Sequence, residues 1–202
     1  MTARTRIRTF KFFVATALAG ALVASTGVQA QNAGVKETTK SLQRALARLP
    51  YYGVFDYLSF SVDRGTVTLL GYAYSGTLKT DAEHAVKRVA GVDEVANRLE
   101  LLPASLNDDR IRQATFLRIY GDSVLSRYAS GGPGAALYDA LEFGRIPGRQ
   151  PFGNYAIHIV VKGGRTTLVG NVDSAMDRQL AEFRAREVTG LFGLNNELTI
   201  VR

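Results

Sequence analysis

The segment LSFSVDRGTVTLLG, residues 58–71, gives the clearest indication of how this chain folds. Apolar and polar residues alternate on both sides of a turn at residues 63–65, which is the pattern of a β-hairpin with one buried face. The segment IHIVVKGGRTTLVG, residues 157–170, repeats it after a constant shift of 99 residues. Matching residues under this shift are Gly65 and Gly164, Gly71 and Gly170, Gly91 and Gly190, and Asn97 and Asn196. Two copies predict two tandem small domains, because a solenoid requires at least three repeats.

The apolar spacing around each hairpin predicts one helix before it and a helix and a strand after it. In the first copy, a stripe from Leu42 to Leu49 predicts a helix that Pro50 ends. A second stripe from Ala82 to Val89 and a strand from Val95 to Leu101 follow the hairpin. We therefore predict an α+β fold of two tandem α-β-β-α-β units. Each unit has a three-stranded mixed sheet with two helices on one face.

The repeat also predicts the domain boundaries: a first domain at 36–102, a linker at 103–107 and a second domain at 108–202. The second domain carries an insertion rich in Gly and Pro at 126–153. Its first helix is expected to be capped by Asp108 or Asp109 and to run to about Val124. Residues expected to face the core on this helix are Ile111, Ala114, Leu117 and Val124. Because domains this small bury thin cores, we expect the two copies to pack on one another.

Residues 1–30 have the pattern of an export signal: a basic start, an apolar run at 12–24 and small residues before Gln31. The apolar run is shorter than the roughly 20 residues of a membrane-spanning helix. We expect cleavage after Ala30 and a periplasmic protein, with an uncleaved membrane anchor as the alternative.

The composition of the chain argues against several classes of function. Four of the 25 basic residues lie in the signal, and the remaining 21 face 18 acidic residues, a net charge of +3. This mild excess, with no concentrated basic stripe, argues against nucleic-acid binding. The absence of cysteine excludes disulfides and thiolate chemistry.

Candidate catalytic residues are few. The Gly121-Asp122-Ser123 block and the Asp81-Ala82-Glu83-His84 block resemble parts of an esterase triad. Their order along the chain is reversed relative to such enzymes, and Ser123 is expected at a helix end, away from a strand-to-helix turn. We therefore predict no enzymatic activity.

The chain has only two histidines, His84 and His158, and no spacing that supplies the three or four convergent ligands of a zinc site. His158 alternates with two isoleucines and is expected to point away from the core face of its strand. No phosphate-binding glycine motif is present. We predict neither a metal nor a cofactor.

The motifs that follow the hairpins resemble those of the BON domain family. VTLLG at 67–71 with GVDEVANRL at 91–99 carries the resemblance in the first copy, and TTLVG at 166–170 with GLFGLNNEL at 190–198 carries it in the second. The resemblance implies a non-enzymatic envelope protein linked to osmotic stress, and some such proteins bind anionic phospholipids. Asn97 and Asn196 are interpreted as hydrogen-bonded amides that tie the third strand to the preceding loop. Gly71 and Gly170 are interpreted as positions where a helix closely approaches the sheet.

Two functional hypotheses stay open: contact with anionic phospholipid or membrane-bound partners, and an adaptor or chaperone-like role on envelope proteins without lipid contact. The residues expected to make the contact are basic or apolar side chains of the first helix and the insertion. They are Lys36, Lys40, Arg44, Arg127, Leu137, Tyr138, Leu141, Arg145 and Arg149. The oligomeric state is not predicted.

Overall fold

The computed structural model describes residues 24–132 and 150–201. The chain forms two compact units that meet between Glu37 and Thr38. The described part of the first unit is the beginning of helix α1 (Ala24–Ala47), and the second unit contains both sheets. The predicted cleavage point after Ala30 falls within α1, whereas residues 1–23 of the predicted signal lie outside the described residues. Within the described ranges, no helix has both the length and the apolar character needed to cross a membrane.

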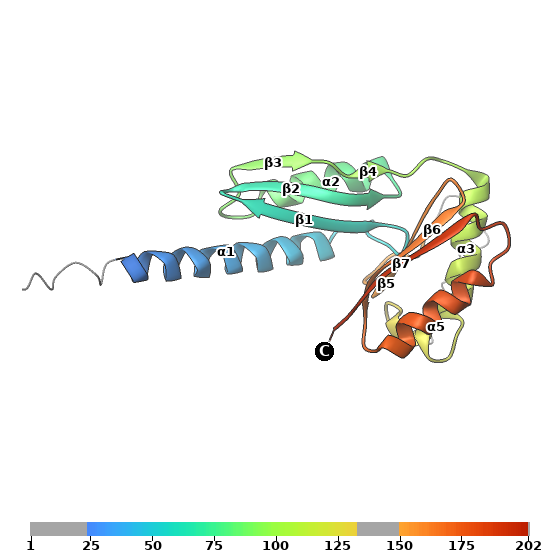
Figure 1. Ribbon diagram of the computed structural model, residues 1–202. Helices are drawn as coiled ribbons and strands as arrows, with labels where there is room; N and C mark the ends of the chain where they lie inside the picture. Colours follow the sequence, from blue (N-terminus) through green and yellow to red (C-terminus); the bar gives the residue numbers. More distant parts are fainter. Residues whose placement is uncertain (1–23, 133–149, 202) are drawn as a thin grey trace, which may run out of the picture. The chain divides into compact units, whose positions relative to one another are not determined.

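The first repeat has the predicted order of elements. After α1 come the strands and helix β1 (Tyr57–Asp63), β2 (Thr66–Ala73), α2 (Gly76–Lys87), β3 (Glu94–Asn97) and β4 (Glu100–Leu101). β1 is antiparallel to β2, and β3 and β4 are both parallel to β2 (Figure 1). The predicted third strand is divided into β3 and β4, whereas its counterpart in the second repeat is continuous.

The second repeat forms a separate sheet. Its elements are α3 (Leu106–Tyr120), the 3-10 helix η1 (Leu125–Tyr128), β5 (Ile157–Lys162), β6 (Arg165–Val172), α5 (Ala175–Arg186) and β7 (Gly193–Ile200). β5 is antiparallel and β7 parallel to β6, and within residues 24–132 and 150–201 the two sheets share no strand pair. The predicted α+β fold of two similar units, each with a mixed sheet, is confirmed.

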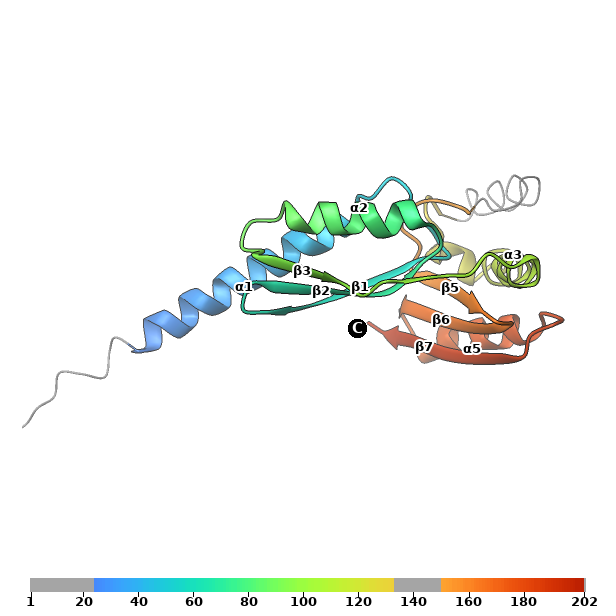
Figure 2. The same cartoon turned by 90° about the horizontal axis from the view of Figure 1, so that it is seen from above.

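Each repeat buries one face of its sheet under its helices, and Figure 2 shows α2 running alongside the first sheet. The first core joins α1, α2 and β2 through Leu42, Leu46, Ala82, Val86, Val67 and Leu69. The second core joins α3 and α5 to β5 and β6 through Phe116, Ile119, Ala181, Ala185, Ile157, Ile159 and Leu168. Alternation on the strands places these apolar residues on a single face.

Helix α3 differs from its prediction at both ends and in its buried face. Ser105 is the N-cap, since its hydroxyl accepts the Asp108 N–H at 3.2 Å, and the helix ends at Tyr120, before Val124. The predicted cap Asp108 instead accepts the N–H groups of Gly163 and Gly164, both at 2.8 Å. The buried apolar residues on α3 are Ile111, Phe116, Ile119 and Tyr120, whereas Leu117 and Val124 are 46% and 42% exposed. The buried apolar residues follow one another at steps of five, three and one positions, whereas the prediction had assumed steps of three from Ile111 to Leu117.

The interpretation of Gly71 and Gly170 is also corrected. Both have a positive φ, +112° and +129°, which is unfavourable for other residues. A Cβ on Gly71 would overlap the carbonyl oxygen of Tyr57, and a Cβ on Gly170 would overlap that of Ala156. The close neighbour is therefore the adjacent strand or the residue before it, and no helix is involved.

The two repeats share buried contacts, as their small size leads one to expect. Val54 and Phe55 precede β1 in the first repeat, yet both are fully buried in the core of the second. Backbone hydrogen bonds hold this segment: the Val54 N–H donates to the Pro151 carbonyl at 3.1 Å, and the Ile159 N–H donates to the Val54 carbonyl at 2.8 Å. The helix-free face of the second sheet packs on the first repeat through Val160, Val169, Leu102, Tyr57 and Tyr72.

Candidate functional site

Helix α1 carries a row of exposed basic side chains. Lys40 and Arg44, both expected contact residues, are exposed, and Arg48 extends the row with the same spacing of four residues. Lys36 is also exposed and lies in the other compact unit. Residues 38–55 contain no Asp or Glu. Neither Lys40 nor Arg48 pairs with a carboxylate of the described residues.

An exposed aromatic pair lies just after α1. Tyr51 and Phe152 are 48% and 43% exposed, and their ring centroids are 5.9 Å apart. Tyr51 follows the basic row by three residues, and Phe152 comes from the end of the predicted insertion. Sequence reasoning missed both this pair and Arg48. The i+4 spacing could have revealed Arg48, but the pairing of Tyr51 with Phe152 depends on contacts between the repeats.

Arg127 is engaged inside the second repeat. Its guanidinium pairs with Asp177 at 2.7 Å and Asp173 at 3.6 Å, and lies 4.9 Å from the centroid of the Tyr128 ring. These carboxylates balance the charge of Arg127. Its attraction to an anionic surface is therefore weaker than the sequence suggested. The other expected contact residues of the insertion, Leu137, Tyr138, Leu141, Arg145 and Arg149, lie outside the described residues.

The repeated asparagines form the same contacts in both repeats. The Asn97 amide donates to the Lys79 carbonyl at 2.9 Å and to Glu83 at 3.1 Å. The Asn196 amide donates to the Arg178 carbonyl at 2.9 Å and to Glu182 at 3.1 Å. Each amide ties the third strand to the helix before it, α2 or α5, and not to the loop as expected. Both asparagines therefore have a structural role. The turn glycines also have one, since all four have a positive φ: Gly65, Gly91, Gly164 and Gly190.

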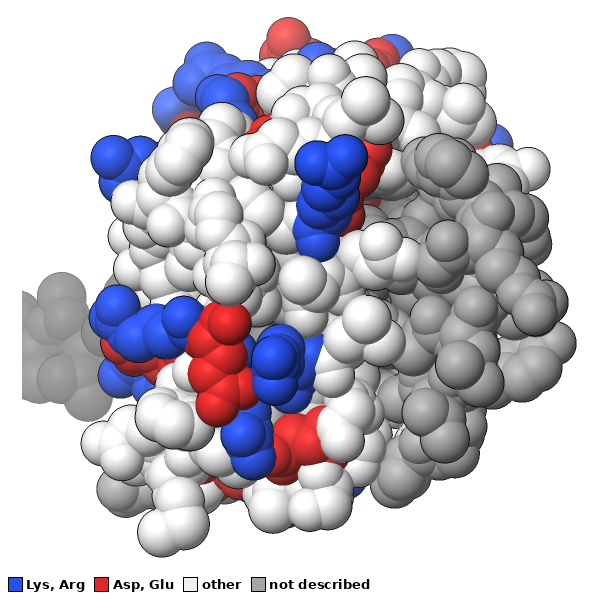
Figure 3. All heavy atoms as spheres, turned by 90° about the vertical axis from the view of Figure 1, so that its right-hand side faces the viewer, with Lys and Arg blue, Asp and Glu red and all other residues white. Residues whose placement is uncertain are grey.

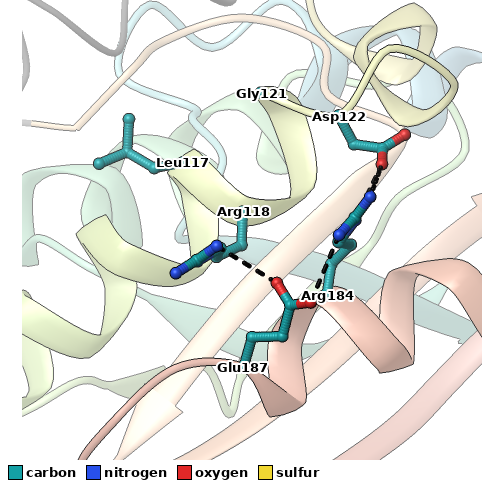
Figure 4. A pocket seen from close by; sticks show the side chains of 6 residues that line it. All are labelled: Leu117, Arg118, Gly121, Asp122, Arg184 and Glu187. Carbon is teal, nitrogen blue, oxygen red and sulfur yellow. Dashed lines mark hydrogen bonds and ion pairs between the residues drawn. The ribbon is translucent and has the colours of Figure 1, made fainter.

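An open cavity of about 250 Å³ lies between the C-terminal ends of helices α3 and α5 (Figure 4). Its lining residues are Leu117, Arg118, Gly121, Asp122, Arg184 and Glu187. The two arginines come from different helices and converge on Glu187, each with an Nη1 atom 3.3 Å from one of its oxygens. Figure 3, which faces this side of the protein, shows basic and acidic groups lying next to each other on a largely uncharged surface.

Among the residues that line the cavity, Asp122 has the most hydrogen-bond donors around its carboxylate. One of its oxygens accepts the N–H groups of Val124 and Leu125 at 2.8 and 3.2 Å. The other accepts Arg184 Nε at 2.9 Å and pairs with its Nη2 at 2.8 Å. Burial by itself would raise the pKa of Asp122, but these donors and the Arg184 charge hold it below its usual range.

The resemblance to an esterase triad has no counterpart in this geometry. Asp122 is bound to Arg184, the exposed Ser123 follows α3, and His84 lies on α2 of the first repeat. No hydrogen bond joins Ser123 to His84 in the described part of the chain. These residues therefore do not assemble as a nucleophile and base.

A buried polar cluster joins the repeats. The Asp56 carboxylate is fully buried and accepts the Tyr74 N–H at 2.6 Å, the Gly53 N–H at 2.9 Å and the Gln150 side-chain amide at 2.6 Å. Burial raises the pKa of Asp56 to about 6, against the opposing effect of these donors. His158 points away from its core face, as predicted, but is only 6% exposed.

His158 is covered by the first repeat. Its Nε2 atom lies 3.1 Å from the Tyr52 hydroxyl, and the Tyr57 ring lies 6.0 Å away. Burial lowers the pKa of His158 to about 4, so the ring is neutral at pH 7. Among the described residues, no group of three or more His, Asp or Glu side chains could hold a metal ion.

A family model described as the BON domain matches residues 34–103 and 144–202. Among curated proteins, none matches this sequence.

Two solved structures of CdsD, a structural protein of the type III secretion system of Chlamydia trachomatis, resemble the chain at 12% identity. One alignment covers 82% of this chain and 92% of CdsD with a TM-score of 0.27. The other, to the C-terminal domain, covers 81% of this chain and 96% of that one with a TM-score of 0.25. TM-scores this low carry no argument about fold or role.

Proposed function

Because this chain belongs to the BON domain family and carries the domain twice, we propose that it is an exported, non-enzymatic binding module of the cell envelope whose helix α1 contacts anionic phospholipid. The single observation that carries the lipid contact is the row of exposed basic side chains at Lys40, Arg44 and Arg48, with no acidic residue from 38 to 55. Basic side chains beside an anionic membrane surface each contribute about 1 kcal/mol to binding.

The exposed aromatic pair supports the same contact. Aromatic rings with one polar end are favoured at membrane–water interfaces, where the ring lies among apolar groups and the hydroxyl stays hydrated. Tyr51 has this character, and Phe152 packs against it edge to face. Basic side chains followed by exposed aromatic ones are typical of segments that lie on a membrane surface without spanning it.

The test is sedimentation of the mature protein with vesicles of phosphatidylcholine alone or mixed with phosphatidylglycerol, at low and high salt. The wild type is expected to pellet with the anionic vesicles at low salt and to be released by high salt, since screening weakens exposed charges. The triple variant Lys40→Gln, Arg44→Gln, Arg48→Gln should lower the partition coefficient about 100-fold, which is what roughly 3 kcal/mol is worth.

A matched control removes three exposed basic residues elsewhere. Arg98→Gln, Arg110→Gln, Arg165→Gln changes the net charge by the same amount and should retain most of the binding, because these residues lie outside α1. Equal losses in the two triple variants would show that only net charge matters and would contradict a site on α1. A wild type that pellets with neither vesicle would favour the adaptor role over lipid contact.

A further inference from the structure

We infer that the two arginines lining the α3–α5 cavity form a carboxylate-binding site, with which the protein's own Glu187 pairs until a carboxylate of a partner protein replaces it. This inference concerns a different surface from the α1 row and does not depend on lipid contact. The observations that carry it are the convergence of two guanidinium groups on Glu187, the long ion-pair distances of Glu187, and the exposed apolar side chain of Leu117 in the lining.

The two arginines are placed to grip one carboxylate. Arg118 Nη1 lies 3.3 Å from Glu187 Oε2, and Arg184 Nη1 lies 3.3 Å from Glu187 Oε1, so a single carboxylate bridges α3 and α5 (Figure 4). Planar guanidinium groups suit the two oxygens of a carboxylate. Arg184 is fixed on its other side by Asp122, at 2.8 Å, so its position does not depend on Glu187.

Glu187 is the displaceable member of the network. Its two ion-pair distances exceed the 2.7–2.9 Å that is usual for a charged hydrogen bond between nitrogen and oxygen. Its Oε2 atom is buried and has no hydrogen bond of good geometry. The Glu187 side chain is 29% exposed, whereas that of Asp122 is 7% exposed and has four donor contacts. A better-placed carboxylate can therefore replace Glu187 without disturbing Asp122.

The surroundings indicate which carboxylate. Leu117 lines the cavity and is 46% exposed, and Phe183, 60% exposed, lies 5.9 Å from the Arg184 guanidinium. With Glu187 displaced, two guanidinium groups face the single remaining charge of Asp122, which leaves one positive charge for a singly charged ligand. The matching ligand is a carboxylate next to an apolar side chain, as at the C-terminus or at an acidic residue of a protein.

The first test uses two small probes that differ in one charge. N-acetyl-leucine carries an apolar side chain and a free carboxylate, and N-acetyl-leucinamide replaces that carboxylate with a neutral amide. Titration is followed by NMR through the side-chain Nε–H signals of Arg118 and Arg184. The acid should shift these signals in a saturable way, and the amide should not. Equal shifts from both probes, or none from either, would overturn the site.

Variants then identify the competitor. If Glu187 leaves the site open about one tenth of the time, Glu187→Gln should bind N-acetyl-leucine about tenfold more tightly than the wild type. Arg118→Gln should lose most of the binding, while Arg110→Gln, an exposed arginine on the same helix, should behave as the wild type. Unchanged affinity in Glu187→Gln would contradict the role of Glu187. Inorganic phosphate is titrated in parallel, and tighter binding of phosphate than of N-acetyl-leucine would overturn the carboxylate assignment.

Discussion

At the scale of single residues, Asp56 and His158 are two buried titratable groups with opposite effects on stability. The pKa of His158 falls from 6.5 to about 4 on folding, so its contribution is complete above pH 6.5 and is lost as the pH falls toward 4. The pKa of Asp56 rises from 3.8 to about 6, so its contribution is complete below pH 3.8 and is lost as the pH rises through 6. Each pKa shift corresponds to a change of about 3 kcal/mol in the free energy of unfolding across its pH range.

Removing either group should therefore change how the free energy of unfolding depends on pH, in opposite directions for the two groups. As the pH falls from 6.5 to 4, the free energy of unfolding of His158→Gln should rise by about 2–3 kcal/mol relative to that of the wild type. The reason is that the variant has no histidine at this position to take up a proton on unfolding. The free energy of unfolding of Asp56→Asn should fall relative to that of the wild type over the same pH range, in addition to any loss of stability that does not depend on pH. Urea unfolding at half-unit steps of pH measures both. Parallel profiles for the two variants would contradict this account of the buried cluster.

At the scale of elements, the repeated asparagines link each third strand to the helix that precedes it. Asn97→Ala and Asn196→Ala each remove two donated hydrogen bonds and the side-chain acceptor of the N–H two residues further on, at a cost of about 1–2 kcal/mol. The two losses should be similar, because the contacts match in geometry. Asn195→Ala is the control: this residue neighbours Asn196 on β7 but is exposed, and its change should stay within about 0.5 kcal/mol. Urea unfolding compares the three, and a loss at Asn195 as large as that at Asn196 would count against the specific link.

At the scale of the whole molecule, the second core depends on a segment of the first repeat. Phe55 is fully buried there, its ring centroid 5.8 Å from that of Tyr74, and its N–H donates to the Gln150 side chain at 3.0 Å. Replacing a buried Phe by Ala costs about 3–5 kcal/mol. We therefore expect Phe55→Ala to destabilise the second repeat by this amount, although residue 55 lies more than a hundred positions before β5 begins.

Hydrogen exchange followed by NMR tests this expectation, with the amide of Leu168 reporting on the second core and that of Leu69 on the first. The control is Phe183→Ala, whose ring is 60% exposed and whose loss should cost less than about 0.5 kcal/mol. Protection of Leu168 that is unchanged in Phe55→Ala, with a loss confined to Leu69, would contradict the shared core.

The amino-acid sequence alone was enough to predict the two repeats, their α-β-β-α-β order and which strand residues share a face. These features depend on local spacing: alternation places Val67 and Leu69 on one face, and the i+4 row on α1 places Leu42 and Leu46 together. The orientation of His158 away from the core followed from the same alternation. A strand or helix has these periods wherever it lies in the molecule.

What covers each surface depends on long-range contacts that are visible in the three-dimensional structure. Local spacing left the buried face of α3 undetermined, so Leu117 was expected in the core but lines the cavity with Arg118 and Arg184. The burial of Phe55 in the other repeat, the contact of Asp56 with Gln150 and the covering of His158 by Tyr52 each join residues about a hundred positions apart. Such contacts depend on how one repeat packs against the other, and periodicity within a segment carries no information about its distant neighbours.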